Sequence, residues 1–203
     1  MSHREDLLAG AVQCLREKGY AHTTARDIAA VANSNLGSIG YHFGSKEALL
    51  NEAIRKGFAE WTAQLGNIAF ADAGATPLER GRASWVALTE SFEEHRPLIV
   101  AFVEALAQSV RSDELRAQLA DIYEDGRAAV GRLVEASFGE TEVGDEQCRA
   151  VASFMIAVCD GLLLQWLVDP ERAPSGAELT AGLEAALPVA LARGAVPQLS
   201  ASR

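Results

Sequence analysis

The residues with the clearest chemistry lie in one segment, Asn33 to Lys46, with the sequence NSNLGSIGYHFGSK. Gly37 and Gly40 keep this segment thin, so its backbone can approach a large surface closely. The polar groups of its residues 36–43 are a hydroxyl, a phenol and an imidazole, on Ser38, Tyr41 and His42. Such groups bond phosphate oxygens and base edges. The segment therefore predicts contact with nucleic acid.

A capped helix is expected just before this segment. Residues 23–32 (TTARDIAAVA) begin with two hydroxyl residues and continue with helix-forming ones. Thr23 or Thr24 is expected to cap the helix, and Asp27 follows Thr24 at the spacing of a capping box. The residues expected on one face of this helix are Ile28, Val31 and Ala32.

A turn and a second, short helix follow. Asn33 suits the turn because asparagine tolerates the left-handed backbone conformation. Asn35 can cap the helix 36–43, and Gly44 and Ser45 can end it and cap the next one. The apolar anchors of this helix are Ile39 and Phe43. Together these signals predict a helix-turn-helix.

The string TTARDIAAVA followed by LGSIGYHFGSKEALL resembles the DNA-binding head of TetR-family transcriptional regulators. The resemblance covers about residues 7–50. It implies an all-α protein with a three-helix helix-turn-helix head, residues 1–48, and a helical ligand-binding and dimerisation body, residues 49–203. It also implies a dimer, joined through its last two helices, that binds a near-palindromic double-stranded DNA operator and is released by a small-molecule inducer.

The resemblance assigns roles to six head residues. It implies phosphate contact for Thr24 and His42, a groove-facing guanidinium for Arg26, and backbone or base contacts for Ser38 and Tyr41. Lys46 would add charge to a phosphate site at a helix N-terminus. The alternatives are a solvated Arg26 and a Lys46 paired with Glu47.

Two positions depart from the family pattern. Leu36 stands where the family often has lysine, and Gly40 stands where it often has tyrosine. One charge and one aromatic contact are therefore missing, which leaves the operator sequence open. DNA recognition should then depend more on Arg26 and Tyr41. Ser34 replaces a usual apolar turn residue.

The charge of the 203-residue chain is divided unequally. The net charge is -10, of which residues 1–56 carry +1 and residues 57–203 carry -11. DNA should therefore meet the head, with the acidic remainder turned away. The polar start predicts no signal peptide, so we expect a cytoplasmic protein. The three cysteines are widely spaced without a metal-binding pattern, and we expect them to be reduced.

The body should be helical throughout, because alternating strand patterns are missing. We expect a helix over residues 78–95, another that begins at Pro97, and a long one capped by Ser112. Residues 150–168 are apolar enough to suggest a membrane span, but Asp160 near the centre argues against one. We expect this helix to be buried on two sides, against the body and against a second subunit. The last helix, residues 178–193, should be kinked at Pro188.

A ligand pocket is expected in this body. Its candidate lining is Phe102, Glu104, Tyr123, Phe154 and Asp160. An acidic, aromatic pocket would favour a lipophilic cation. The alternative is that these residues are ordinary core and surface.

We expect no enzyme activity, cofactor or metal site. The chain has no Glu-x-x-His pair, no phosphate-binding glycine loop and no nucleophile motif. Two other hypotheses remain open: a helical protein-interaction module, and an activator rather than a repressor.

Overall fold

The structure is a computed structural model that describes residues 3–138 and 143–192, and from residue 187 onward it describes the backbone alone. The described residues form α-helices and no strand, as the sequence predicts. The helices are α1 (His3–His22), α2 (Ala25–Val31), α3 (Leu36–Phe43), α4 (Lys46–Ala69), α5 (Pro77–Glu90), α6 (Phe92–Ser109), α7 (Asp113–Phe138), α8 (Asp145–Val168) and α9 (Gly176–Ala192).

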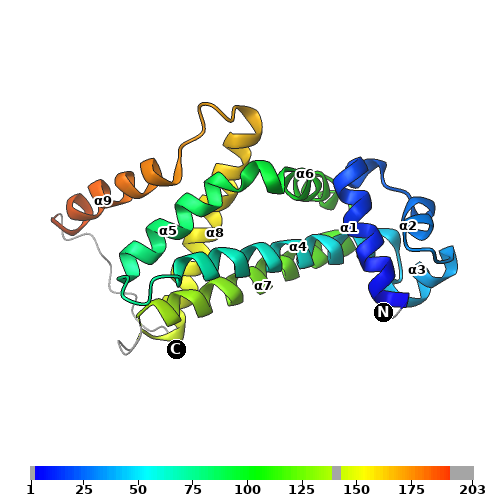
Figure 1. Ribbon diagram of the computed structural model, residues 1–203, viewed down its shortest axis with the longest axis horizontal. Helices are drawn as coiled ribbons and strands as arrows, with labels where there is room; N and C mark the ends of the chain where they lie inside the picture. Colours follow the sequence, from blue (N-terminus) through cyan, green and yellow to red (C-terminus); the bar gives the residue numbers. More distant parts are fainter. Residues whose placement is uncertain (1–2, 139–142, 193–203) are drawn as a thin grey trace.

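The first three helices form a head at one end of an elongated molecule (Figure 1). Helices α4 and α7 run side by side along its length and connect the head with α5, α8 and α9 at the other end. The boundary expected between residues 48 and 49 lies inside α4. One helix therefore belongs to both the head and the body.

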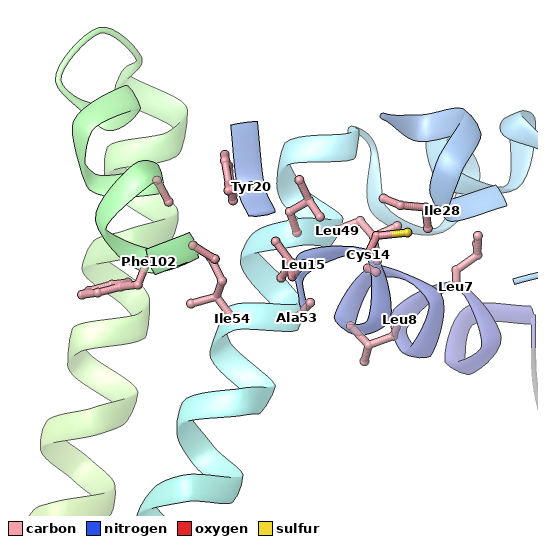
Figure 2. Close-up of a cluster of buried hydrophobic side chains, with 14 of the residues drawn as sticks. Leu7, Leu8, Cys14, Leu15, Tyr20, Ile28, Leu49, Ala53, Ile54 and Phe102 are labelled. Atoms are coloured by element: carbon pink, nitrogen blue, oxygen red, sulfur yellow. The ribbon is translucent and has the colours of Figure 1, made fainter. Parts of the chain in front are cut away.

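The core of the head continues into the body. Leu7, Ile28 and Leu49 are fully buried in a cluster that also contains Phe102 of α6 and Ile122 of α7 (Figure 2). Burying apolar surface is the main favourable term in folding. The same cluster therefore stabilises the head and fixes its position on α6 and α7.

Two glycines of the head have positive φ angles. Gly19 interrupts α1 with φ 76° and ψ 174°. Gly44 ends α3 with φ 81°. Asn33 shares this backbone region, with φ 47°, which confirms its role in the turn.

The helix expected over residues 78–95 was wrong at its C-terminal end. The chain bends at Ser91, and α6 begins at Phe92 instead of Pro97. The Ser91 hydroxyl donates to the carbonyl of Leu88 at 2.9 Å and accepts from Trp61 Nε1 at 2.9 Å. Phe92 is buried next to Trp61, so packing on α4 sets this boundary. Pro97 is tolerated in the second turn of α6.

In the single subunit, helix α8 leaves much of its surface exposed. By length and composition it is the candidate membrane span among the described residues, and only 22% of its apolar window is buried. It packs on α7, whereas α9 packs on α5. An added Cβ at Gly176 would stand 2.3 Å from the carbonyl oxygen of Trp85, so the start of α9 lies directly on α5. The side chains of residues 187–192, including Pro188, lie outside the described part.

Candidate DNA-binding surface and its connection to the body

Helix α3 is short, and local bonds hold both its ends. The Asn35 side chain accepts from the Ser38 backbone N–H at 2.9 Å, as predicted for an N-cap. At the other end the Gly44 N–H donates to the carbonyl of Gly40 at 3.0 Å. Ile39 is 3% exposed and Phe43 packs on the same core. These contacts use only one side of the helix.

The opposite side of α3 is open. Leu36 is 48% exposed and Tyr41 is 85% exposed. Gly37 and Gly40 are exposed between them. An added Cβ at Gly40 would meet no atom within 4 Å, so packing inside the head does not require a glycine there. This side of α3 is available to a large partner, and Ser38 lies half-buried at its edge.

The N-terminus of α2 carries the predicted capping box. The Asp27 N–H donates to Thr24 Oγ1 at 3.2 Å, and the Thr24 N–H donates to the Asp27 carboxylate at 2.9 Å. Hydrogen bonds from Lys18 and Thr24 hold the pKa of Asp27 well below its usual range. The Thr24 hydroxyl donates to the same carboxylate at 2.7 Å. It is therefore already engaged within the head.

Arg26 and Lys46 differ in whether they already bond other groups of the protein. Arg26 is exposed and forms no ion pair within the described part of the chain. Lys46 instead donates to the carbonyl of Thr23 at 3.0 Å and pairs with Glu47 at 3.2 Å. This ion pair is the alternative to phosphate contact that the sequence offered for Lys46. In this geometry Lys46 ties α4 to the start of α2.

His42 faces away from the open side of α3. Together with Arg4 and Phe43 it lines a hollow of about 260 Å³ that also borders Asn51 of α4 and Gln118 of α7. Its ring packs edge-on against Tyr41, with ring centroids 4.8 Å apart. His42 therefore lies at the junction of head and body, beside the residue that projects outward.

Buried polar groups connect the head to the body at this junction. The Tyr20 hydroxyl donates to Asn51 Oδ1 at 3.0 Å, and Asn51 Nδ2 donates to Gln118 Oε1 at 2.6 Å. Burial raises the pKa of Tyr20 to about 12, so the phenol stays protonated as a donor. The three residues are far apart in sequence and follow no motif. Sequence reasoning therefore missed them.

Glu104, expected in the ligand pocket, forms a second connection instead. Its carboxylate accepts from the Ala21 N–H at 2.9 Å. Gly19 interrupts the helical backbone of α1, and the N–H group that bonds Glu104 belongs to Ala21, two residues after this interruption. The packing of α1 on α6 directs this side chain toward the head.

Three other expected pocket residues do come together in the body. The rings of Phe102 and Tyr123 lie 5.7 Å apart, and the Tyr123 hydroxyl donates to Asp160 Oδ2 at 2.9 Å. Burial raises the pKa of Asp160, and the bond from Tyr123 opposes this rise only in part. Burial, together with the Asp160 charge, also raises the pKa of Tyr123. The result is a half-buried acid among aromatic rings.

Phe154 does not join this group. It is 55% exposed on the outer side of α8, together with Val151, Leu164 and Val168 at helical spacing. Leu183 of α9 is 37% exposed. Phe154 lies on this outer side because the other side of α8 packs on α7. Its own side is an apolar surface without a partner in the monomer.

A second hollow, of about 480 Å³, lies on the surface of α5 and the end of α4, lined in part by Ile68 and Val86. Neither hollow is lined by Phe102, Tyr123 or Asp160. No group of three or more metal-ligating side chains occurs among the described residues. The surface best suited to contact a large partner is thus the open side of α3.

Comparisons with known proteins match both parts of the chain. Residues 7–53 match the family described as bacterial regulatory proteins, tetR family, and residues 77–193 match the family described as BetI-type transcriptional repressor, C-terminal. The second match alone covers more than half of the chain.

Individual relatives carry related descriptions. The chain is 28% identical over 186 residues, 91% of this chain and 92% of the relative, to the HTH-type transcriptional repressor DhaR of Mycobacterium sp. strain GP1. It is 38% identical over 102 residues to the HTH-type transcriptional repressor KstR2 of Mycobacterium tuberculosis, and this match spans 50% of each protein.

Solved structures share the fold. One is a TetR-family regulator from Rhodococcus sp., with a TM-score of 0.64 at 20% identity over 93% of this chain and 98% of the other. Another is the multidrug binding protein EbrR complexed with proflavin, with a TM-score of 0.59 at 26% identity over 90% of this chain and 98% of the other.

Proposed function

Since the chain belongs to the TetR family of transcriptional regulators, we propose that it is a dimeric repressor that binds a near-palindromic operator and is released by a small-molecule inducer. The family consists of ligand-responsive, DNA-binding regulators rather than enzymes. Its members are soluble DNA-binding proteins, from which we infer a cytoplasmic location. The observation that carries the proposal is the open side of α3, held rigidly by caps and by Ile39 while Tyr41 is 85% exposed.

DNA contact is proposed to centre on α3 and the start of α2. Tyr41 and Ser38 lie on or beside the open side of α3, and Arg26 of α2 is an exposed cation that forms no ion pair among the described residues. Thr24, His42 and Lys46 are proposed as phosphate contacts, although each already has an intramolecular role. Lys46 and Thr24 would then need water or backbone rearrangement to reach DNA, so Arg26 and Tyr41 should matter most.

Dimerisation is proposed through α8 and α9. The exposed apolar side chains of α8 include Phe154 and Val168, at 55% and 86% exposure. A symmetric pair would bury them against their own copies. Two heads could then meet major grooves about 34–36 Å apart. Phe154→Asp should place a charge in that surface and yield monomers by light scattering, whereas Leu78→Ala, on α5, should leave the dimer intact.

An inducer is proposed to bind among the body helices near Phe102, Tyr123 and Asp160. The half-buried carboxylate of Asp160 supports a lipophilic cation as ligand, and the related EbrR was solved with proflavin. Binding would require these packed rings to separate, since neither hollow includes them. The inducer shifts the heads only to the extent that it prefers one arrangement over the other.

The test is recovery of genomic DNA by the purified protein. We expect a specific fragment with two related half-sites, bound by one dimer and lost with Tyr41→Ala. Proflavin should raise the melting temperature and release the fragment, and Asp160→Asn should weaken both effects. A protein that retains no specific fragment at moderate salt would contradict the proposal. Transcription of a bound promoter with and without the protein separates repression from activation.

A further inference from the structure

The open side of α3 has an unusual chemical composition for a surface that reads DNA. Consecutive residues of an α-helix project about 100° apart, so Leu36, Gly40, Gly37 and Tyr41 follow one another around one arc of the helix. The two glycines lie in the middle of this arc, and Leu36 and Tyr41 flank them. Ile39 and Phe43 occupy the buried side. The helix thus offers a bare backbone between two large side chains.

Gly40 leaves room on this arc for the close approach of an external surface. Glycine in a helix interior is less favourable than alanine. An added Cβ at Gly40 would meet no atom within 4 Å, so the head itself gives no reason for the glycine. Gly37 differs, because its added Cβ would stand 3.2 Å from the capping oxygen of Asn35. Close approach of the major groove explains a glycine at position 40.

This arc of α3 lacks the side chains that recognise guanine through paired hydrogen bonds. Bidentate contacts to guanine or adenine use Arg, Lys, Asn or Gln, and residues 36–43 contain none of these. Elsewhere in the head, Lys18 bonds Asp27 at 2.6 Å and Lys46 bonds the Thr23 carbonyl. Within α2 and α3, Arg26 is the one arginine or lysine, and it remains for such a contact. The most exposed aliphatic side chain of α3 is Leu36.

From this composition we infer that the chain reads thymine methyl groups, through Leu36 and Tyr41 on a half-site approached closely at Gly40. The thymine C5 methyl is the apolar group that base edges present in the major groove, and aliphatic or aromatic side chains recognise it by contact. The inference rests on the proposed function and specifies its DNA target: half-sites whose central positions are T·A pairs, with at most one guanine position, read by Arg26.

The experiment replaces thymines one at a time with deoxyuridine, which lacks only the methyl group, in the operator bound by the full-length protein. Losing one buried methyl should weaken binding about fourfold. We expect this loss at one or two thymines of each half-site. Leu36→Ala should weaken binding to the thymine operator and abolish the effect of deoxyuridine at the position that Leu36 contacts.

Leu78→Ala is the matched control, because Leu78 is a similarly exposed leucine, at 55%, in the first turn of α5. It should change neither affinity nor deoxyuridine sensitivity. A second probe, 7-deazaguanine, removes a major-groove acceptor and should affect only the position read by Arg26. The deoxyuridine series on the unaltered protein needs no variant to fold.

Specific binding that is unaffected by deoxyuridine at every position would overturn this inference and leave the proposed function standing. The same holds if 7-deazaguanine weakens binding at several positions. Failure to form any sequence-specific complex would overturn both.

Discussion

Gly40→Ala should make the protein more stable and a poorer DNA binder. The added Cβ meets no atom within 4 Å in the free protein, so it introduces no internal clash. Replacing a helix-interior glycine by alanine should stabilise the head by about 1 kcal/mol. For a chain of this size the melting temperature should rise by about 2–4 °C.

The same methyl group would stand between α3 and the bases. Forcing an extra methylene-sized group into a packed contact costs about 1–3 kcal/mol, which corresponds to a roughly 5- to 150-fold loss of affinity per half-site. The assays are thermal unfolding followed by circular dichroism and operator binding followed by fluorescence anisotropy. The same variant should therefore gain thermal stability and lose affinity for the operator.

Two glycine variants serve as controls. Gly131→Ala, in α7, also adds a Cβ without neighbours within 4 Å, and it should raise stability without changing DNA affinity. Gly37→Ala brings its Cβ to 3.2 Å from the N-cap oxygen, so it should not stabilise the protein. If Gly40→Ala raised the melting temperature and bound the operator as tightly as the unaltered protein, close approach at this position would be refuted.

Further predictions concern buried polar groups. Tyr20→Phe removes the donor to Asn51 Oδ1 and should destabilise the protein by about 1–3 kcal/mol in urea unfolding, because a buried acceptor loses its partner; an unchanged unfolding midpoint would contradict this role. Asp160→Asn should raise the melting temperature near neutral pH. Burial raises the pKa of Asp160, so its charged form opposes folding, and that cost disappears as the pH falls and the carboxyl is protonated. The difference between variant and parent should therefore shrink between about pH 7 and about pH 4; a difference that grows on acidification would show that the sign is wrong.

The local structure of the head was predictable because its causes are local. Thr24 with Asp27, Asn33 in the turn, and Asn35 and Ser45 as caps all act through bonds to residues within a few positions. Residue type and spacing are sufficient to identify such bonds. The resemblance to TetR-family heads rests on this same local pattern, and the comparisons confirm it.

The direction of long side chains was decided by tertiary packing. Glu104 was expected among aromatic pocket residues, yet α6 packs on α1 and presents it to the Ala21 N–H. Phe154 lies on the far side of α8 because the near side packs on α7. Periodicity places apolar residues on a face but does not say which neighbour covers that face. Val31, expected on the same face as Ile28, is 40% exposed whereas Ile28 is fully buried, for the same reason.

The sequence by itself determined the helix-turn-helix, its caps and the acidic body, since these follow from residue type and short spacings. Only the tertiary structure decided that α4 joins head and body through a common core, that Tyr20, Asn51 and Gln118 meet, and that Gly40 has open space before it. These are relations between segments far apart in the chain, and they arise from how helices pack. The open side of α3 is where the two levels meet: its residues are local, and its exposure is tertiary.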